Sequence, residues 1–146
     1  MCEILLGFRH LHERDIVYRD VKPENILIDM DGHIRIADFG LAKVIRENER
    51  SHSLCGSPEY LSPEMIVQGE GHDRRLDIYS LGVLLYEMLT GLPPYYDENH
   101  EVMFDKILHD ELVLDQTNLS YESKHLLSML LERDPVMRPQ SIDEIM

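Results

Sequence analysis

The octapeptide "YRDVKPEN" (residues 18–25) concentrates charged and amide groups at the edge of an apolar segment. Asp20 could accept a proton from a hydroxyl group, and Lys22 could neutralise the charge of a phosphoryl group in transfer. Each residue alone is a weak indication, because an Asp beside an Arg usually forms an ordinary salt bridge. The chemistry therefore depends on what else the chain brings to this segment.

A second acid and an amide could complete a metal site beside this octapeptide. The apolar run 26–28, the Asp31-Gly32 pair and the alternation around 34–36 predict a β-hairpin. Asn25 enters its first strand and Asp38 leaves its second, so the two side chains can converge. A carboxylate and an amide oxygen suit Mg²⁺, a hard cation that prefers oxygen ligands.

The remaining elements must position these groups, and hydrophobic periodicity predicts most of them. Helices are expected at 2–13, 75–90, 98–109 and 121–132. Residues 41–64 show no sustained period and are expected to form a long, polar, mobile loop. The sequence "SIDE" at 141–144 predicts a capping box, with Ser141 as N-cap and Glu144 at N3. The expected fold class is mostly α with a small β-hairpin (α+β), in one domain.

The composition restricts the partners. The formal net charge is −14, from 28 acidic residues against 14 Lys and Arg, which disfavours nucleic acid and anionic membranes. The longest apolar region, 76–91, carries Asp77 and Glu87 and is too short and too charged to span a bilayer.

The cysteines and the N-terminus bear on the compartment. Two cysteines provide no disulfide framework, and the first residues lack the pattern of a signal peptide, so a cytoplasmic or nuclear protein is expected. No histidine and cysteine spacing typical of zinc ligands occurs, and zinc is not expected.

Three motifs follow one another in a recognisable order: "YRDVKPEN", then "DFG" at 38–40 and "SPE" at 62–64. They resemble the catalytic loop, the metal-binding triplet and the end of the activation segment of protein kinases. With "DIYSLGVLLYEMLTGLPPYYDEN" and "LLERDPVMRP", the resemblance covers essentially the whole chain. The chain resembles the C-terminal lobe of a eukaryotic serine/threonine protein kinase and is most similar to the AGC group, although "RPQS" departs from that group's usual sequence.

The resemblance implies ATP and Mg²⁺ as cofactors and a role for each matching residue. Asp20 would orient the substrate hydroxyl and accept its proton, while Lys22 would stabilise the γ-phosphate. Asn25 and Asp38 would hold Mg²⁺. Leu27 would lie beneath the adenine, although a plain core position explains it equally well.

The resemblance also implies a switch in the activation segment, residues 38–64. Arg19 would pair with a phosphate added by an upstream activating kinase. Ser53 matches the phosphorylated position, and Lys43 would be the second cation. Ser51 is the nearest rival, and Ser53 as a merely solvated serine is the alternative.

Acidic positions of the resemblance imply protein substrates rich in arginine. The carboxylates that would receive substrate arginines are Glu24, Glu59 and Glu87. Glu87 stands in an otherwise apolar helix and needs a partner, so an internal hydrogen bond is its alternative explanation. Ser57 is expected to hydrogen-bond Asp20 and Lys22 and to help define hydroxyl specificity.

Other matching positions are implied to be structural. Glu64 and Arg138 would tie the activation segment to the end of the domain, and Asp77 would anchor the catalytic loop from below. Phe39 would pack behind the metal site and set its active or inactive pose.

No G-x-G-x-x-G motif occurs, and the nucleotide-clamping lysine of kinases belongs to their N-terminal lobe. Residues 1–146 are therefore expected to be a partial kinase domain, from the end of helix E to the start of the last helix, with the N-terminal lobe absent. The expected function is that of a serine/threonine kinase present as a truncated catalytic domain, inactive in isolation. The alternative is a non-catalytic kinase-lobe fragment that acts as a binding or regulatory module.

Overall fold

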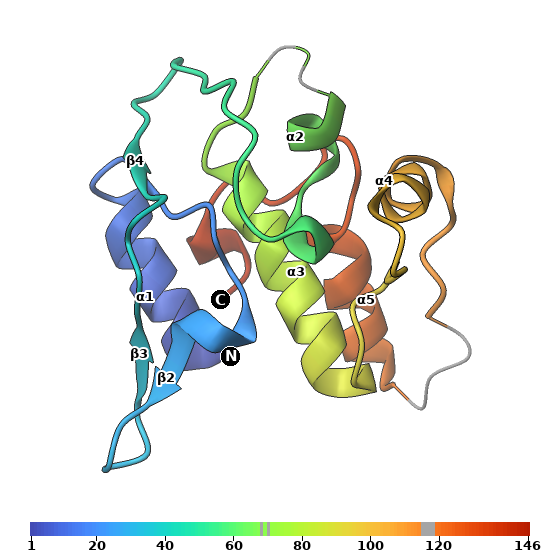
Figure 1. Cartoon of the computed structure of the whole chain (residues 1–146). Helices are drawn as coiled ribbons and strands as arrows, with labels where there is room; N and C mark the ends of the chain where they lie inside the picture. Colours follow the sequence, from blue (N-terminus) through green and yellow to red (C-terminus); the bar gives the residue numbers. More distant parts are fainter. Residues whose placement is uncertain (68, 70, 115–118) are drawn as a thin grey trace.

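Helix α3 (Arg75–Thr90) forms the centre of the computed structural model, between α1 (Cys2–His12) and α5 (Tyr121–Leu130) (Figure 1). The structure describes residues 1–67, 69, 71–114 and 119–146. Helices α2 (Pro63–Val67) and α4 (His100–His109) complete the α-helices of this described part. Helices and short antiparallel strand pairs confirm the predicted fold class.

The two helices with the clearest apolar patterns begin and end close to their predicted bounds. Helix α1 buries Ile4, Leu5, Phe8, Leu11 and His12, the set expected from its 3.6-residue period. Helix α3 is buried without interruption from Leu76 to Leu84, but its last turn is exposed. Gly91 ends it in the left-handed conformation, with φ +93°, where a residue without Cβ is favoured.

Capping explains where α4 and α5 begin. The Asn99 side chain accepts hydrogen bonds from the first backbone N–H groups of α4, and Ser120 does the same for α5. The capping box predicted at 141–144 was wrong. Ser141 makes no side-chain capping bond, Glu144 accepts instead from the backbone N–H of Gln140 at 2.9 Å, and residues Ile142–Glu144 form a single 3₁₀ turn, η3.

The predicted hairpin is present. Strand β2 (Ile26–Ile28) pairs with β3 (Ile34–Ile36) in antiparallel register, with Ile26 opposite Ile36. The 3₁₀ turn η1 (Pro23–Asn25) leads directly into β2. Gly32 in the connecting turn has φ +87°, a value that favours glycine.

Residues 41–64 are more ordered than the sequence predicted. Strand β4 (Lys43–Val44) pairs with β1 (Ile16–Val17), and Ser51 forms an isolated antiparallel bridge with His72. The 3₁₀ turn η2 (Pro58–Tyr60) follows before α2. Each of these elements is two or three residues long, too short to produce a hydrophobic period.

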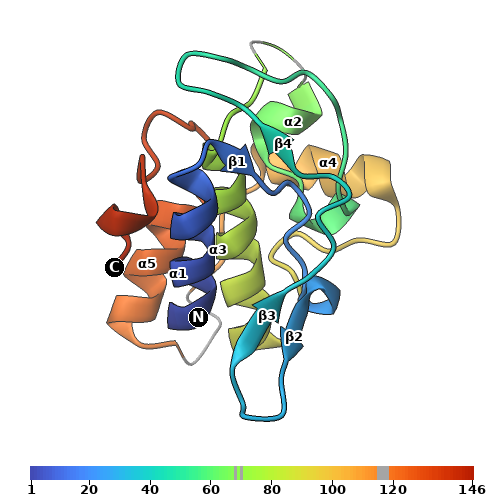
Figure 2. The same cartoon turned by 90° about the vertical axis from the view of Figure 1, so that its left-hand side faces the viewer.

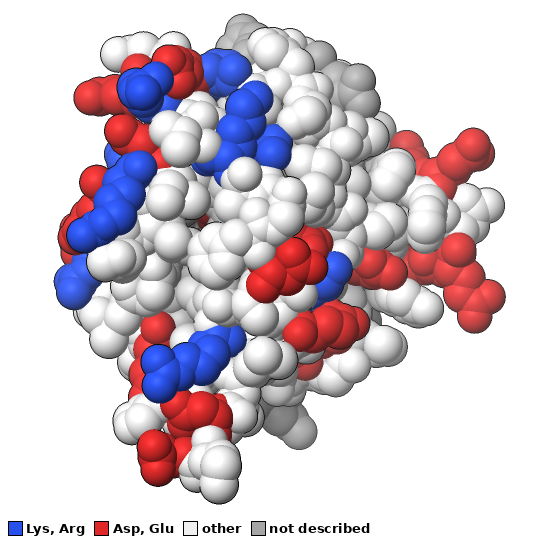
Figure 3. Space-filling view, turned by 60° about the vertical axis from the view of Figure 1, so that its left-hand side comes forward, with Lys and Arg blue, Asp and Glu red and all other residues white. Residues whose placement is uncertain are grey.

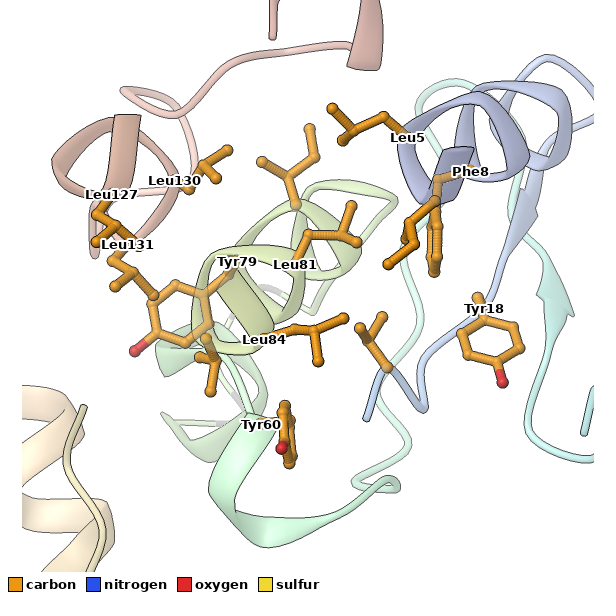
Figure 4. Close-up of a cluster of buried hydrophobic side chains, with 14 of the residues drawn as sticks. Leu5, Phe8, Tyr18, Tyr60, Tyr79, Leu81, Leu84, Leu127, Leu130 and Leu131 are labelled. Carbon is orange, nitrogen blue, oxygen red and sulfur yellow. The ribbon is translucent and has the colours of Figure 1, made fainter. Parts of the chain in front are cut away.

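The hydrophobic core surrounds α3 (Figure 4). Leu5 and Phe8 of α1 approach α3 from one side, and Leu127 and Leu130 of α5 approach it from the other (Figure 4). Figure 2 shows the same helices from the side of α1. A Cβ at Gly82 would lie 2.8 Å from Leu130 Cβ, so this glycine permits the close approach of α3 and α5. Among the described residues, no helix is long and apolar enough to cross a membrane.

Gly82→Ala is expected to destabilise the chain, although alanine has the higher helix propensity. The added methyl group would push α5 away, and overpacking of a core costs about 1–3 kcal/mol, more than the roughly 1 kcal/mol gained in propensity. Urea unfolding measures the difference. Ser128→Ala on the exposed face of α5 is the control, and a more stable Gly82→Ala variant would contradict the packing argument.

Candidate active site

A buried carboxylate on α3 fixes the start of the segment "YRDVKPEN". Asp77 has no exposed surface and accepts hydrogen bonds from the backbone N–H groups of Tyr18 and Arg19, both at 2.8 Å. His12 Nε2 of α1 lies 2.8 Å from the same carboxylate. The anchoring contact expected of Asp77 is therefore present, and it holds Arg19 at φ +69°, which is uncommon for a residue with a side chain.

Four of the predicted site residues form one hydrogen-bonded cluster. Asp20 is 7% exposed, and its Oδ2 accepts from Asn25 Nδ2 at 2.9 Å and lies 2.9 Å from Lys22 Nζ. Ser57 Oγ accepts from Lys22 Nζ at 3.1 Å and donates to Asp20 Oδ1 at 3.2 Å, which are the contacts expected of Ser57. The hydrogen bond to Asp20 raises the pKa of Lys22, so the ammonium group stays charged.

Asn25 and Asp38 have the chemistry of a magnesium site. The side-chain amide nitrogen of Asn25 donates to Asp20, which leaves the side-chain oxygen Oδ1 available. The backbone carbonyl of Asn25 accepts a hydrogen bond from the backbone N–H of Ala37 at 2.9 Å. The hairpin therefore brings the residue after Ala37 back toward the loop. Asp38 is exposed and close enough for its charge to contribute to the raised pKa of Lys22.

The two oxygen donors suit Mg²⁺, which does not need a site closed by protein ligands alone. Within the described ranges, no group of three or more His, Cys, Asp or Glu side chains could hold a metal ion. Mg²⁺ takes one or two protein oxygens and completes its shell with water and phosphate oxygens. An amide and a carboxylate at the edge of the cluster match that requirement.

Tyr18 supports this cluster from behind, a role that sequence reasoning did not assign. Its ring is fully buried, lies edge-on to Phe8 and Phe39 at 5.5 and 5.4 Å, and its hydroxyl donates to the carbonyl of Ala37. Burial, with a smaller contribution from the charge of Asp20, raises the pKa of Tyr18 to about 12. Phe39 thus packs on Tyr18, although half of its surface is exposed.

The acidic residues predicted to bind substrate lie together. Glu24, Glu59 and Glu87 line one open cavity of about 530 Å³, which Lys22, Asn25 and Ser57 also line. The Tyr60 hydroxyl donates to the Glu87 carboxylate, so the internal hydrogen bond considered for Glu87 exists. Burial and this hydrogen bond raise the pKa of Tyr60, which therefore remains a donor. Leu27 lies on β2 with half of its surface exposed.

The predicted regulatory residues also meet. Arg19 Nη1 donates to Ser53 Oγ at 2.7 Å, and Lys43 Nζ donates to Ser51 Oγ at 3.1 Å. The two serine oxygens are 3.2 Å apart. Ser51 is only 1% exposed whereas Ser53 is exposed, so a modifying enzyme could reach Ser53 alone of the two.

The predicted Glu64–Arg138 pair is present, with N–O distances of 2.8 and 2.6 Å. The guanidinium of Arg138 also lies 5.0 Å from the centre of the Tyr79 ring. This bidentate ion pair ties the first turn of α2 to the segment that follows α5.

Charge is unevenly distributed on the surface. On the face shown in Figure 3, Lys and Arg gather in the upper and left parts, and the right-hand part carries mainly Asp and Glu. The net charge of −14 is therefore compatible with local positive clusters such as the one around Arg19.

Comparisons with known proteins identify the class that this fold and site define. The model of the protein kinase domain matches residues 1–146, and the chain therefore belongs to the protein kinase family. Its relatives are serine/threonine kinases of the AGC type, which confirms the family and the group predicted from the motifs.

The relatives are similar over most of this chain. It is 54% identical over 133 residues (91% of the chain) to Protein kinase 2 of Dictyostelium discoideum. It is 48% identical over 139 residues (94%) to the serine/threonine-protein kinase YPK2/YKR2 of Saccharomyces cerevisiae, and 49% identical over 148 residues (99%) to AtPK2/AtPK19 of Arabidopsis thaliana. The chain covers only 27%, 20% and 31% of these three proteins.

Asp77→Asn is expected to loosen the whole site. An amide offers one acceptor where two backbone donors and His12 now bind, and a buried donor without a partner costs about 1–3 kcal/mol. Amide hydrogen exchange at Tyr18 and Arg19 should become faster, and the urea midpoint should fall. Asp143→Asn at an exposed ion pair is the control; unchanged protection at both amides would contradict the anchoring role.

Proposed function

We propose that the protein containing this chain transfers the γ-phosphoryl group of ATP to serine or threonine hydroxyl groups of protein substrates. The observation that carries this proposal is the hydrogen-bonded cluster of Asp20, Lys22, Asn25 and Ser57, with Asp38 beside it. A scaffold would need no such set at the mouth of an open cavity.

In this proposal, each residue of the cluster has its own role in the phosphoryl transfer. Asp20 orients the acceptor hydroxyl and takes its proton while the new oxygen–phosphorus bond forms and the bond to the ADP leaving group breaks. Lys22 neutralises charge on the phosphoryl oxygens during this transfer. Asn25 and Asp38 would hold Mg²⁺, which would supply further charge neutralisation at the phosphates when bound.

We further propose that the nucleotide clamp comes from residues outside these 146. No G-x-G-x-x-G motif occurs among them, and phosphoryl transfer depends almost entirely on positioning and charge neutralisation. The chain alone should therefore transfer no measurable phosphate. A cytoplasmic or nuclear location is part of this proposal, because both cysteines are free thiols.

Replacing Asp20 tests the catalytic role. In a protein that joins this chain to a kinase N-terminal lobe, Asp20→Asn is expected to reduce kcat by about 10²-fold to 10⁴-fold, because the proton acceptor is lost. Asp31→Asn, an equivalent change in the exposed hairpin turn, should leave kcat unchanged. Radiolabelled phosphate transfer measures both, with the isolated chain as a third sample.

Retention of more than a tenth of the activity by Asp20→Asn would overturn the proposed catalytic role. Asp20-dependent transfer by the isolated chain would overturn the proposal that the nucleotide clamp lies outside these 146 residues. Partner binding by the longer protein without any phosphate transfer would instead support the alternative, a binding or regulatory module.

We also propose arginine-rich substrates. Glu24, Glu59 and Glu87 line the cavity that reaches the catalytic cluster, and a carboxylate pairs with a guanidinium through two parallel hydrogen bonds. Glu87 is the best placed of the three, because Tyr60 holds its carboxylate in position.

A peptide library scored for arginine upstream of the acceptor tests this preference. Glu87→Gln is expected to raise KM for an arginine-containing peptide about tenfold with little change in kcat, because it removes binding rather than chemistry. Glu98→Gln, an exposed residue outside this cavity, is the matched control. Absence of any arginine preference in the unmodified protein would refute the substrate proposal.

Regulation completes the proposal. We propose that an upstream kinase modifies Ser53: its oxygen bonds to the γ-phosphorus of ATP, its proton leaves, and ADP is released. Ser53 is exposed, and its oxygen already accepts a hydrogen bond from Arg19. Arg19 and Lys43 would then bind the phosphate.

A further inference from the structure

His72 is buried beside the regulatory serines with part of its side chain unused. It exchanges both backbone hydrogen bonds with Ser51, each at 2.9 Å. Side chains of two directly opposed residues project to the same face of such a pair, so the imidazole lies on the side of Ser51 Oγ. His72 is 3% exposed, and within the described part of the chain its Nε2 has no hydrogen-bond partner.

Two cationic side chains and one histidine come together here from three segments. Arg19 comes from the loop after β1, Lys43 from β4 and His72 from the segment before α3. On the activation segment, Arg19 donates to the Ser53 hydroxyl and to the Leu41 carbonyl, and Lys43 donates to the Ser51 hydroxyl, all of them neutral groups. Among the described residues, no carboxylate forms an ion pair with Arg19 or Lys43, so their positive charge has no matching anion in this part of the chain.

The charges around His72 keep it neutral as the structure stands. Burial first, then the positive charge of Arg19 and that of Lys43, lower the pKa of its imidazole. His52 acts in the same direction, and Glu64 opposes it. The Glu64 carboxylate is already bound in its bidentate pair with Arg138, so it is not a hydrogen-bond partner of His72 Nε2.

We propose that His72 is the third protein ligand of a phosphate group on Ser53, beside Arg19 and Lys43. This inference rests on the proposed modification of Ser53 and deepens it. A phosphomonoester has three terminal oxygens and a charge near −2, so it can accept from three cationic donors at once. The unused Nε2 becomes a donor when the ring takes up a proton, which satisfies a buried atom that now lacks a partner.

The proposal makes phosphate binding depend on pH. A nearby dianion raises the pKa of His72 from its lowered position in the unmodified protein. The additional stabilisation of the phosphate by protonated His72 is therefore fully present below the pKa that His72 has in the unmodified protein. It is lost as the pH rises through the raised pKa that His72 has in the phosphorylated protein. By linkage, protonated His72 lowers the second pKa of the phosphate by the same interaction.

An NMR titration tests the proposal directly. Phosphoserine is incorporated at position 53 during translation, and the imidazole Cε1–Hε1 signals are followed against pH with serine and with phosphoserine. The pKa of His72 is expected to rise by about one unit or more, a tenfold change in proton affinity. His52, an exposed histidine next to Ser53 in the chain, is the internal control. A shift at His72 no larger than that at His52 would overturn the proposal.

A second measurement uses the rate at which a phosphatase removes the phosphate. His72→Gln should accelerate removal several-fold at pH 6 and remove the difference between pH 6 and pH 8, whereas His52→Gln should change neither. Equal rates for His72→Gln and the unmodified protein at pH 6 would contradict the inference. If His72→Gln does not fold, the titration of the unmodified histidine still decides.

The two proposals can fail separately. A raised pKa of His72 in a protein without phosphotransfer activity would refute the proposed function alone. Full activity that depends on Ser53 phosphate, with the pKa of His72 unmoved, would refute this inference alone.

Discussion

The position of the segment "YRDVKPEN" depends on one buried carboxylate. Asp77 projects from the most hydrophobic helix of the molecule and would be costly there without partners. Two backbone N–H groups and the ring of His12 provide them. One side chain therefore joins α1, α3 and the start of the segment that carries Asp20 and Lys22, and the positions of those residues follow from the packing of the two helices.

The other long-range connections use the same principle. Arg138 is almost fully buried and is compensated by Glu64, by backbone carbonyls and by the face of Tyr79. This pair holds α2, and with it the residues before α2 that approach Asp20 through Ser57. Several partners offset the cost of burying each of these charged groups; removing one partner would leave the others buried and unpaired.

The sequence predicted the long elements and the residues of the hydrogen-bonded cluster, but not the short strand pairings. Helices α1 and α3 carry many apolar residues at a clear period, and the Asp31-Gly32 turn marks the hairpin. Strand β4 and the Ser51–His72 bridge are held by backbone contacts between residues far apart in the chain, which leave no local pattern. The capping box failed because the Glu144 carboxylate binds one residue earlier than the motif requires. An isolated histidine such as His72 gives no signal at all until its neighbours are known.

Arg19 connects the two halves of the site. Its backbone N–H is bound to Asp77, while its side chain reaches Leu41 and Ser53 of the activation segment. The residue after Arg19 is Asp20. The orientation of the proposed base and the position of the activation segment therefore both depend on Arg19. Arg19 and Lys43 already donate hydrogen bonds to the two serine hydroxyls, and His72 pairs with Ser51 through the backbone. The proposed phosphate would therefore act by adding charge to an existing arrangement, and the backbone of the segment "YRDVKPEN", fixed by Asp77, would not have to move.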